Sequence, residues 1–183
     1  PLEIEEIDID KPGPHEVLTR TAASGICHSD LHVIEGSIPM PIPCVLGHEP
    51  AGIVEAVGSE VTDVAVGDHV IGCLNAWCGQ CEYCLTGRPH LCLPPIISRS
   101  PDEPARLSKA GDPIVQFALS SFAEYMLTHE RSLVKIRDDM PLDRAALIGC
   151  GVTTGVGAAL RTARVEPGSS TAIIGCGGVG LSA

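Results

Sequence analysis

Short runs in which hydrophobic and polar residues alternate follow one another along most of the chain. Such alternation is typical of β-strands that bury one face. The pattern predicts strands at residues 2–9, 16–23, 51–57, 69–73, 122–128 and 133–136. Turn residues such as Lys11-Pro12-Gly13-Pro14 and Val66-Gly67-Asp68 separate these runs. We therefore expect a mostly-β domain, with the polar, proline-containing residues 95–113 as an irregular loop.

The pattern changes after residue 140. Helical patterns at 142–148, with Pro141 near the start, and at 154–163 predict a helical link. Residues 170–174 (Ser-Thr-Ala-Ile-Ile) predict a short buried strand that runs directly into a glycine-rich turn. We therefore divide the chain into a mostly-β domain at 1–150 and a link with the start of an α/β domain at 151–183. One strand and its turn are only the beginning of such a domain, so we expect this chain to be part of a longer protein.

Composition and charge narrow the range of partners. The chain has 20 glycines, 15 prolines and only 3% aromatic residues, which favours short strands joined by tight turns. Its formal net charge of −11 argues against a nucleic-acid partner and against an anionic membrane surface. No apolar run approaches the roughly 18 to 20 residues of a membrane-spanning helix. No basic region followed by an apolar stretch opens the chain, so we expect a cytoplasmic protein.

Nine cysteines, without a secretory signal, favour metal binding over disulfides. Residues 77–94 show little hydrophobic periodicity and contain four of them with the spacing C-x2-C-x2-C-x7-C: Cys78, Cys81, Cys84 and Cys92. Short C-x2-C steps let one turn of backbone direct two thiolates at one ion, and zinc prefers four such ligands in a closed, structural site. An iron–sulfur cluster, whose bacterial motif has a shorter last gap, and thiols without a metal are the alternatives.

Three further segments combine glycine with cysteine or histidine: Gly25-Ile26-Cys27-His28-Ser29-Asp30, Gly47-His48-Glu49 and Gly149-Cys150-Gly151-Val152-Thr153-Thr154-Gly155. Together with the four-cysteine segment and the closing glycine motif, they resemble the zinc-dependent medium-chain alcohol dehydrogenases over nearly the whole chain. The resemblance implies a GroES-like catalytic domain at 1–150 and the start of a Rossmann-type dinucleotide-binding domain at 151–183. It also implies a second, catalytic zinc ion on Cys27, His48 and Cys150, with a fourth position open for substrate.

The resemblance implies a proton path beside that second zinc ion. Ser29 resembles the hydroxyl that takes the alcohol proton, and His32 resembles the outer end of the relay, reached through the cofactor ribose. Asp30 resembles the carboxylate that orients a ligand histidine, and Glu49 resembles the carboxylate beside the zinc that exchanges onto the metal. Two simpler interpretations stay open: His32 as a surface histidine without a role, and Asp30 as a helix N-cap.

The closing glycine motif predicts a dinucleotide-binding turn. Gly175, Gly177 and Gly180 fit G-x-G-x-x-G, and Gly178 and Val179 complete the turn. In this motif the first glycine permits the tight turn, and the second lets the backbone approach the pyrophosphate. The third lets the helix pack on the strand.

Two side chains complete the implied cofactor site. His28 lies where the family usually offers a basic side chain to the pyrophosphate, and Thr154 resembles a residue that contacts the nicotinamide. The acidic residue that would distinguish NAD from NADP is expected about 20 residues after the motif, outside this sequence. NAD is therefore the expected cofactor, and NADP stays open.

The implied activity is hydride transfer between a primary or secondary alcohol, or an aldehyde, and the dinucleotide, with two zinc ions per chain. A glutathione-linked formaldehyde dehydrogenase of the same superfamily is the alternative. That class carries acidic residues in the loop before the ligand histidine, whereas residues 36–41 read Gly-Ser-Ile-Pro-Met-Pro. A non-catalytic zinc-binding scaffold is a second alternative, although all three ligands of the second zinc are present. Residues 93–112 resemble the dimeric members of the family, so we expect a homo-oligomer and favour a dimer.

Overall fold

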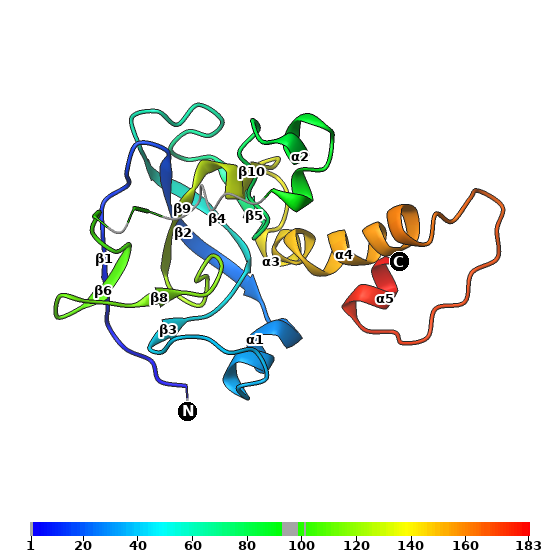
Figure 1. Cartoon of the computed structure of the whole chain (residues 1–183), viewed down its shortest axis with the longest axis horizontal. Helices are drawn as coiled ribbons and strands as arrows, with labels where there is room; N and C mark the ends of the chain where they lie inside the picture. Colours follow the sequence, from blue (N-terminus) through cyan, green and yellow to red (C-terminus); the bar gives the residue numbers. More distant parts are fainter. Residues whose placement is uncertain (1, 93–98, 101) are drawn as a thin grey trace.

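The computed structural model describes residues 2–92, 99–100 and 102–183, and its centre is a five-stranded antiparallel sheet (Figure 1). The strand order is β10-β5-β4-β2-β9. The bounds are β2 Glu16–Gly25, β4 Glu49–Val57, β5 His69–Gly72, β9 Tyr125–His129 and β10 Leu133–Lys135. Five of the six strands predicted from alternation are therefore confirmed, with ends that differ by at most three residues.

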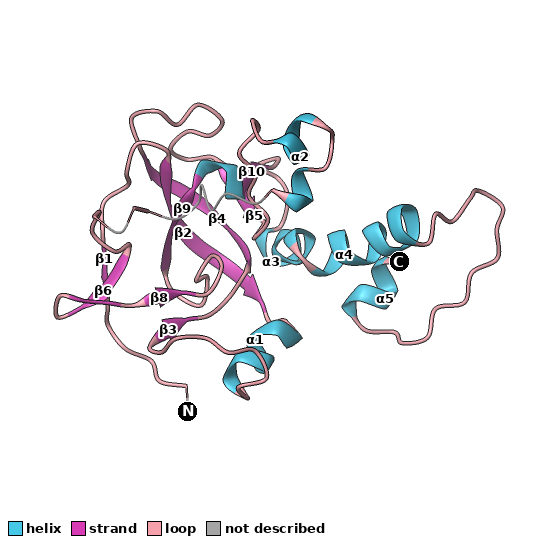
Figure 2. Ribbon diagram, in the orientation of Figure 1, coloured by secondary structure: helices cyan, strands magenta, loops and turns pink. Residues whose placement is uncertain are grey.

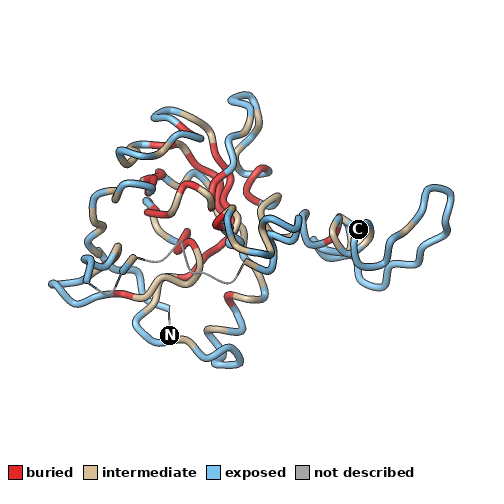
Figure 3. Tube along the Cα trace, turned by 45° about the horizontal axis from the view of Figure 1, so that its top comes forward, coloured by how far each residue is buried: buried red, intermediate tan, exposed pale blue. Residues whose placement is uncertain are grey.

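One face of this sheet holds the main hydrophobic core. Buried residues concentrate along the sheet (Figure 3), and the main cluster consists of Val17, Val54, Val64, Val70, Leu119, Met126 and Leu133. Val57 on β4, which lies opposite Val17 in the strand register, packs against this cluster. Burying each such side chain stabilises the fold by roughly 1.5 to 3 kcal/mol relative to leaving it exposed.

Short strands surround the central sheet (Figure 2). A three-stranded sheet consists of β1 Asp8–Ile9, β6 Leu107–Lys109 and β7 Asp112–Pro113, and β3 Cys44–Val45 pairs in parallel with β8 Val115–Gln116. Two predictions are corrected here. The expected strand at 2–9 shrinks to two residues, because residues 2–6 lie exposed without a partner strand. The loop expected at 95–113 contains two strands; its residues 95–98 and 101 lie outside the described part.

Helices connect the sheets and form the end of the chain. The single-turn and longer helices are α1 His28–Ile34, α2 Glu82–Leu85, η1 Pro89–Leu91, η2 Glu130–Ser132, α3 Leu142–Ala145, η3 Ala146–Gly149, α4 Gly151–Gly157, η4 Ala158–Thr162 and α5 Gly178–Ser182. The predicted helices at 142–148 and 154–163 are confirmed, and Pro141 is the N-cap of α3. No single described helix is long and apolar enough to cross a membrane. Residues Leu142–Gly149 and Gly151–Thr162, bent by 47°, pass that test only as a pair.

Residues 151–183, which we call the C-terminal arm, project from the sheet (Figure 1). α4 leads away from the sheet, and the chain loops back so that α5 packs against α4. The strand predicted at 170–174 is wrong for this chain, since residues 171–176 form no strand and Ile174 is fully exposed. A strand needs a hydrogen-bonded neighbour, and no described strand lies beside this segment.

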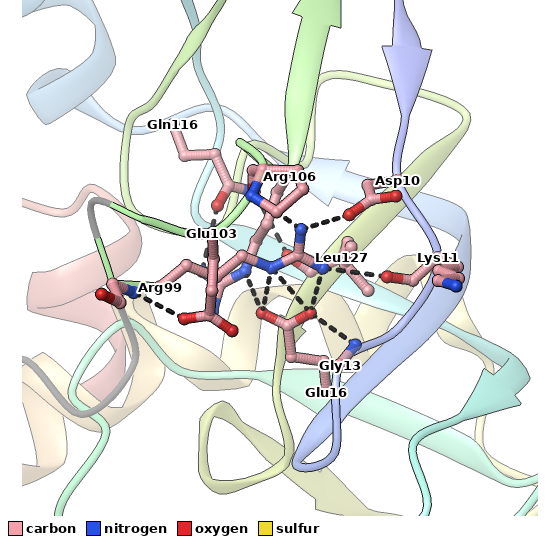
Figure 4. Close-up of polar contacts among 11 residues, drawn as sticks. Asp10, Lys11, Gly13, Glu16, Arg99, Glu103, Arg106, Gln116 and Leu127 are labelled. Atoms are coloured by element: carbon pink, nitrogen blue, oxygen red, sulfur yellow. Dashed lines mark hydrogen bonds and ion pairs between the residues drawn. The ribbon is translucent and has the colours of Figure 1, made fainter.

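A cluster of charged side chains connects Arg99 and Arg106 to Glu16, the first residue of β2 (Figure 4). Glu16 is 5% exposed and accepts hydrogen bonds from Arg99 Nε at 3.0 Å, from Arg106 Nε at 2.6 Å and from the Gly13 N–H at 2.8 Å. Arg99 also pairs with Asp10. Burial raises the pKa of Glu16, but Arg99, the Gly13 N–H and Arg106 outweigh it and lower the pKa to about 2.

Candidate functional site

Four potential metal ligands from three distant segments meet beside the central sheet. The ligand atoms of Cys27, His48, Glu49 and Cys150, which we call the split site, all lie within 4.8 Å of one another. Cys27 follows β2 and is the N-cap of α1, while His48 and Glu49 stand at the start of β4. Antiparallel pairing of Gly25 with Glu49 brings these two strand ends together. Cys150 lies between η3 and α4, and its Sγ is part of the same cluster.

Two glycines make room for this arrangement. A Cβ on Gly25 would overlap the Glu49 carboxylate, so only glycine allows β2 to pass so close to it. Gly47 has φ +97°, and a Cβ there would lie 2.6 Å from the backbone nitrogen of Phe122. Glycine adopts this left-handed conformation without a steric penalty, which sets the direction of His48.

The Asp30 carboxylate connects two of the three segments, those of Cys27 and of Gly47-His48. Its side chain is 1% exposed; Oδ2 accepts from the Cys27 N–H at 3.2 Å and Oδ1 from the Gly47 N–H at 3.0 Å. Oδ1 also faces His48 Nδ1 at 3.4 Å. Asp30 is therefore not the N-cap of α1, which is Cys27, but the capping-box residue one turn later. This position lets one carboxylate orient both a cysteine and the histidine.

The electrostatics of the split site fit a bound cation. Burial, followed by the Glu49 carboxylate and the Cys27 thiol, raises the pKa of Cys150 to about 12. Buried His48 Nδ1 has no well-aligned hydrogen-bond partner among the described residues. Anionic donors crowded in this way repel one another until a positive ion joins them, and sulfur and imidazole are ligands that zinc accepts.

The four-cysteine lobe, residues 78–92, brings its sulfur atoms together around a second point. All four lie within 4.8 Å of one another, with Cys81 and Cys84 3.5 Å apart. α2 begins directly after Cys81 and carries Cys84 on its first turn. Backbone N–H groups of Cys81 and Gln80 donate to Cys78 Sγ at 3.2 and 3.5 Å. Such N–H···S contacts stabilise thiolates, so the lobe has the donor set of a closed zinc site.

The pKa values of the cysteines in the lobe differ from one another. The Gln80 N–H, with further help from the Cys81 N–H, lowers the pKa of Cys78 to about 6. The Cys78 N–H lowers the pKa of Cys92, but burial and the neighbouring thiols outweigh it and raise the pKa to about 12. One cysteine therefore ionises readily, and its negative charge disfavours ionisation of the neighbouring thiols. A bound cation would remove this repulsion.

The lobe is docked to the sheet by an arginine that sequence analysis did not identify. The Arg131 guanidinium lies 4.8 Å from the centre of the Trp77 ring and donates to the Trp77 carbonyl at 3.2 Å. Arg131 follows β9, and Trp77 directly precedes the first lobe cysteine. No spacing links these two positions, so only the fold could reveal the contact.

α1 carries three other predicted site residues. Ser29 is half-buried, with its Oγ 3.7 Å from Cys27 Sγ. His28 and His32 are exposed one helical turn apart, and their ring centres are separated by 6.3 Å. The structure thus places Ser29 at the edge of the split site and both histidines outside its ligand cluster.

Residues 13–138 match the alcohol dehydrogenase GroES-like domain family. The chain belongs to this family. It is 46% identical, over its whole length, to the S-(hydroxymethyl)glutathione dehydrogenase of Saccharomyces cerevisiae, and 43% identical to the class-3 alcohol dehydrogenase of Pisum sativum. It covers 49% and 50% of these proteins, so the chain spans about half the length of the curated relatives it matches.

Solved structures of the family agree with this placement. An alcohol dehydrogenase zinc-binding domain protein from Burkholderia ambifaria superposes with a TM-score of 0.89 at 41% identity, covering 100% of this chain and 51% of that one. Benzyl alcohol dehydrogenase from Acinetobacter calcoaceticus gives 0.82 at 38% identity, covering 98% and 50%. The predicted resemblance to zinc-dependent medium-chain alcohol dehydrogenases and the mostly-β GroES-like fold are confirmed.

The remaining predicted residues of this GroES-like family member lie on the C-terminal arm. Thr154 is exposed on α4, where its N–H donates to the Cys150 carbonyl at 2.8 Å. Gly175 has φ +111°, Gly177 is the N-cap of α5, and a Cβ on Gly180 would overlap the Gly175 carbonyl. Gly178 and Val179 open α5. The structure therefore contains the tight turn that the motif predicts. This turn precedes α5 and is separate from the segments that carry the ligands of the split site.

Proposed function

We propose that the protein containing this chain is a zinc-dependent oxidoreductase that transfers hydride between a primary or secondary alcohol, or an aldehyde, and a nicotinamide dinucleotide. The observation that carries the proposal is the split site: two cysteines and a histidine meet within 4.8 Å although they lie far apart in sequence. Three protein ligands leave one coordination position of a tetrahedral ion for substrate, and Glu49 stands beside them as an exchangeable carboxylate.

The two cysteine-containing clusters suit two zinc ions with different tasks. Cys78, Cys81, Cys84 and Cys92 would fill all four positions of one ion and stabilise the lobe. Cys27, His48 and Cys150 would hold the other, which as a Lewis acid lowers the pKa of a bound alcohol and polarises a bound carbonyl. With the proposed domain division at residue 150, every one of these ligands would belong to the catalytic domain or lie at its edge.

The chain's own residues would move the proton and orient the ligands. Ser29 Oγ lies 3.7 Å from Cys27 Sγ, at the edge of the split site. It would accept the alcohol proton while releasing its own hydroxyl proton, and exposed His32, three positions further along α1, would pass a proton to solvent. Asp30 would keep His48 aimed into the site, because its carboxylate faces Nδ1 from a buried position.

The dinucleotide would bind between this domain and the α/β domain that begins on the arm. The turn formed by Gly175, Gly177 and Gly180 would receive the pyrophosphate, with Gly178 and Val179 at the start of the helix behind it. His28 on α1 would contact the pyrophosphate, and Thr154 on α4 the nicotinamide. NAD is the proposed cofactor, and a cytoplasmic homodimer the proposed state.

A thiol-adduct formaldehyde dehydrogenase is the second candidate function. The observation that favours it is the 46% identity to a relative named S-(hydroxymethyl)glutathione dehydrogenase. The absence of acidic residues at 36–41 argues against glutathione as the adduct. A non-catalytic scaffold would not need the exchangeable carboxylate and the buried orienting aspartate that accompany the split site.

Steady-state assays of the full-length protein would test the proposal. Primary and secondary alcohols, aldehydes and S-(hydroxymethyl)glutathione would be compared with NAD and with NADP, alongside a Cys150→Ser variant. We expect turnover of simple alcohols by the wild type and none by the variant. Turnover of the glutathione adduct alone would favour the second candidate, and no turnover of any substrate would favour the scaffold.

A further inference from the structure

The pair of imidazoles on α1 is the strongest feature of the described chain outside the two cysteine-containing clusters. His28 and His32 are separated by four positions on one face of the helix, both are exposed, and their ring centres lie 6.3 Å apart with the ring planes tilted by 54°. Two histidines at positions i and i+4 are the spacing with which helices chelate transition metals, because both side chains project from neighbouring turns.

Both imidazoles are free to bind a ligand. Within the part of the chain that the structure describes, neither makes a hydrogen bond or an ion pair. Other histidines are already engaged: His15 contacts Glu130 and Glu60, His48 faces Asp30, and His129 accepts from the Arg131 N–H. Neither His28 nor His32 belongs to the split site or to the four-cysteine lobe.

We propose that His28 and His32 together bind one additional, exchangeable divalent transition-metal ion, distinct from the two ions of the cysteine clusters. Imidazole nitrogens suit Zn²⁺, Ni²⁺ and Cu²⁺, and rotation of the two side chains, without a change in the helix, brings one nitrogen of each to a shared ion. Water completes the coordination, because α1 lies at the edge of the molecule (Figure 1). The net charge of −11 raises the local concentration of cations.

An ion at this position would have a consequence for turnover. The proposed function gives the same two imidazoles to the cofactor pyrophosphate and to the proton relay, so the ion would inhibit by occupying both. This consequence rests on the proposed function, whereas binding of the ion does not. A direct binding measurement therefore separates the two ideas.

Calorimetric titration of the full-length protein with Ni²⁺ tests the site. The cysteine clusters are first filled with zinc, and a brief dialysis against a weak chelator removes loosely held metal. We expect one Ni²⁺ per chain, and His28→Ala or His32→Ala should weaken it at least about tenfold, because a two-ligand chelate gains strongly over one ligand. His90→Ala, which removes an exposed histidine of the lobe, should leave this affinity unchanged.

A paired variant controls for the number of histidines. His32→Ala combined with Ile34→His retains the same count but moves the second imidazole away from the face of His28, and it should not restore binding. Zinc content and circular dichroism establish that each variant is folded. No Ni²⁺ binding to the wild type, or equal binding after replacement of both histidines, would overturn the proposal.

Discussion

The four-cysteine lobe and the split site use similar atoms but depend on different parts of the molecule. The lobe takes all its ligands from residues 78–92, which bury few apolar side chains and contain only two short helices, α2 and η1. The split site takes its ligands from residues 27, 48, 49 and 150, and each stands at the end of an element of the central fold. A metal would organise the lobe, whereas the sheet organises the split site before any metal binds.

Replacing one ligand in each site gives the sharpest test of this difference. Cys150→Ser should abolish turnover and lower the zinc content from about two ions to about one while the fold persists. Cys84→Ser should also leave about one ion, but it should unfold residues 78–92 locally and speed their hydrogen exchange. Cys44→Ser, which alters a half-buried cysteine outside both clusters, serves as the control for both measurements. Equal hydrogen-exchange rates of residues 78–92 in both ligand variants would show that the lobe does not depend on its metal.

Ser29→Ala tests whether the split site moves a proton as well as holding a metal. The variant should lower kcat by roughly 10² to 10⁴ because it removes the proton path and no ligand. Zinc content should stay at the wild-type value. Ser29→Thr keeps the hydroxyl and should recover much of the activity. A near-normal kcat for the alanine variant at neutral pH would remove Ser29 from the mechanism.

Glu16→Gln should destabilise the sheet, and with it the split site, by about 3 kcal/mol, because Arg99 and Arg106 would lose a buried counter-charge. The pKa of Glu16 is lowered to about 2. Its stabilisation is therefore complete above the ordinary carboxyl pKa of 4.5 and is lost as the pH falls from about 4.5 towards 2. The wild type and the variant should thus converge in acid-unfolding experiments.

The matched control for this prediction is Glu55→Gln, whose exposed carboxylate pairs with Arg20 at 2.7 Å. Exposed pairs of this kind contribute at most about 1 kcal/mol. Chemical denaturation at pH 7 measures both variants. An equal effect of the two substitutions would mean that the buried cluster adds no more than a surface pair.

Arg131→Met should have the smallest effect, because it releases the lobe from the sheet without touching a ligand. The loss of the contact with Trp77 should cost about 0.5 to 1 kcal/mol and speed the release of zinc from the lobe to a chelator, with the split site unaffected. Arg88→Met removes the contact of Arg88 with Tyr83, which lies inside the lobe, and is the matched control. Faster zinc release in the Arg88 variant alone would place the stabilising contact within the lobe.

Local patterns in the sequence determined the strands of the central sheet, the four-cysteine lobe and the glycine turn. Alternation predicts a strand when one face is buried, and this held for 16–23, 51–57 and 69–73. Alternation failed for most of 2–9, and the apolar run at 170–174 formed no strand, because a strand exists only beside a partner. The C-x2-C steps suffice for the lobe because nearby cysteines reach one point without help from the rest of the chain.

Only the tertiary structure determined how the split site assembles and which distant residues contact one another. Cys27, His48 and Cys150 could be grouped from sequence only by resemblance, whereas the pairing of Gly25 with Glu49 is what brings their segments together. The contacts of Asp30 with Gly47 and His48 and the contact of Arg131 with Trp77 follow no sequence spacing. Contacts between distant residues depend on how sheets and helices pack, and no short-range pattern of residue types encodes that packing.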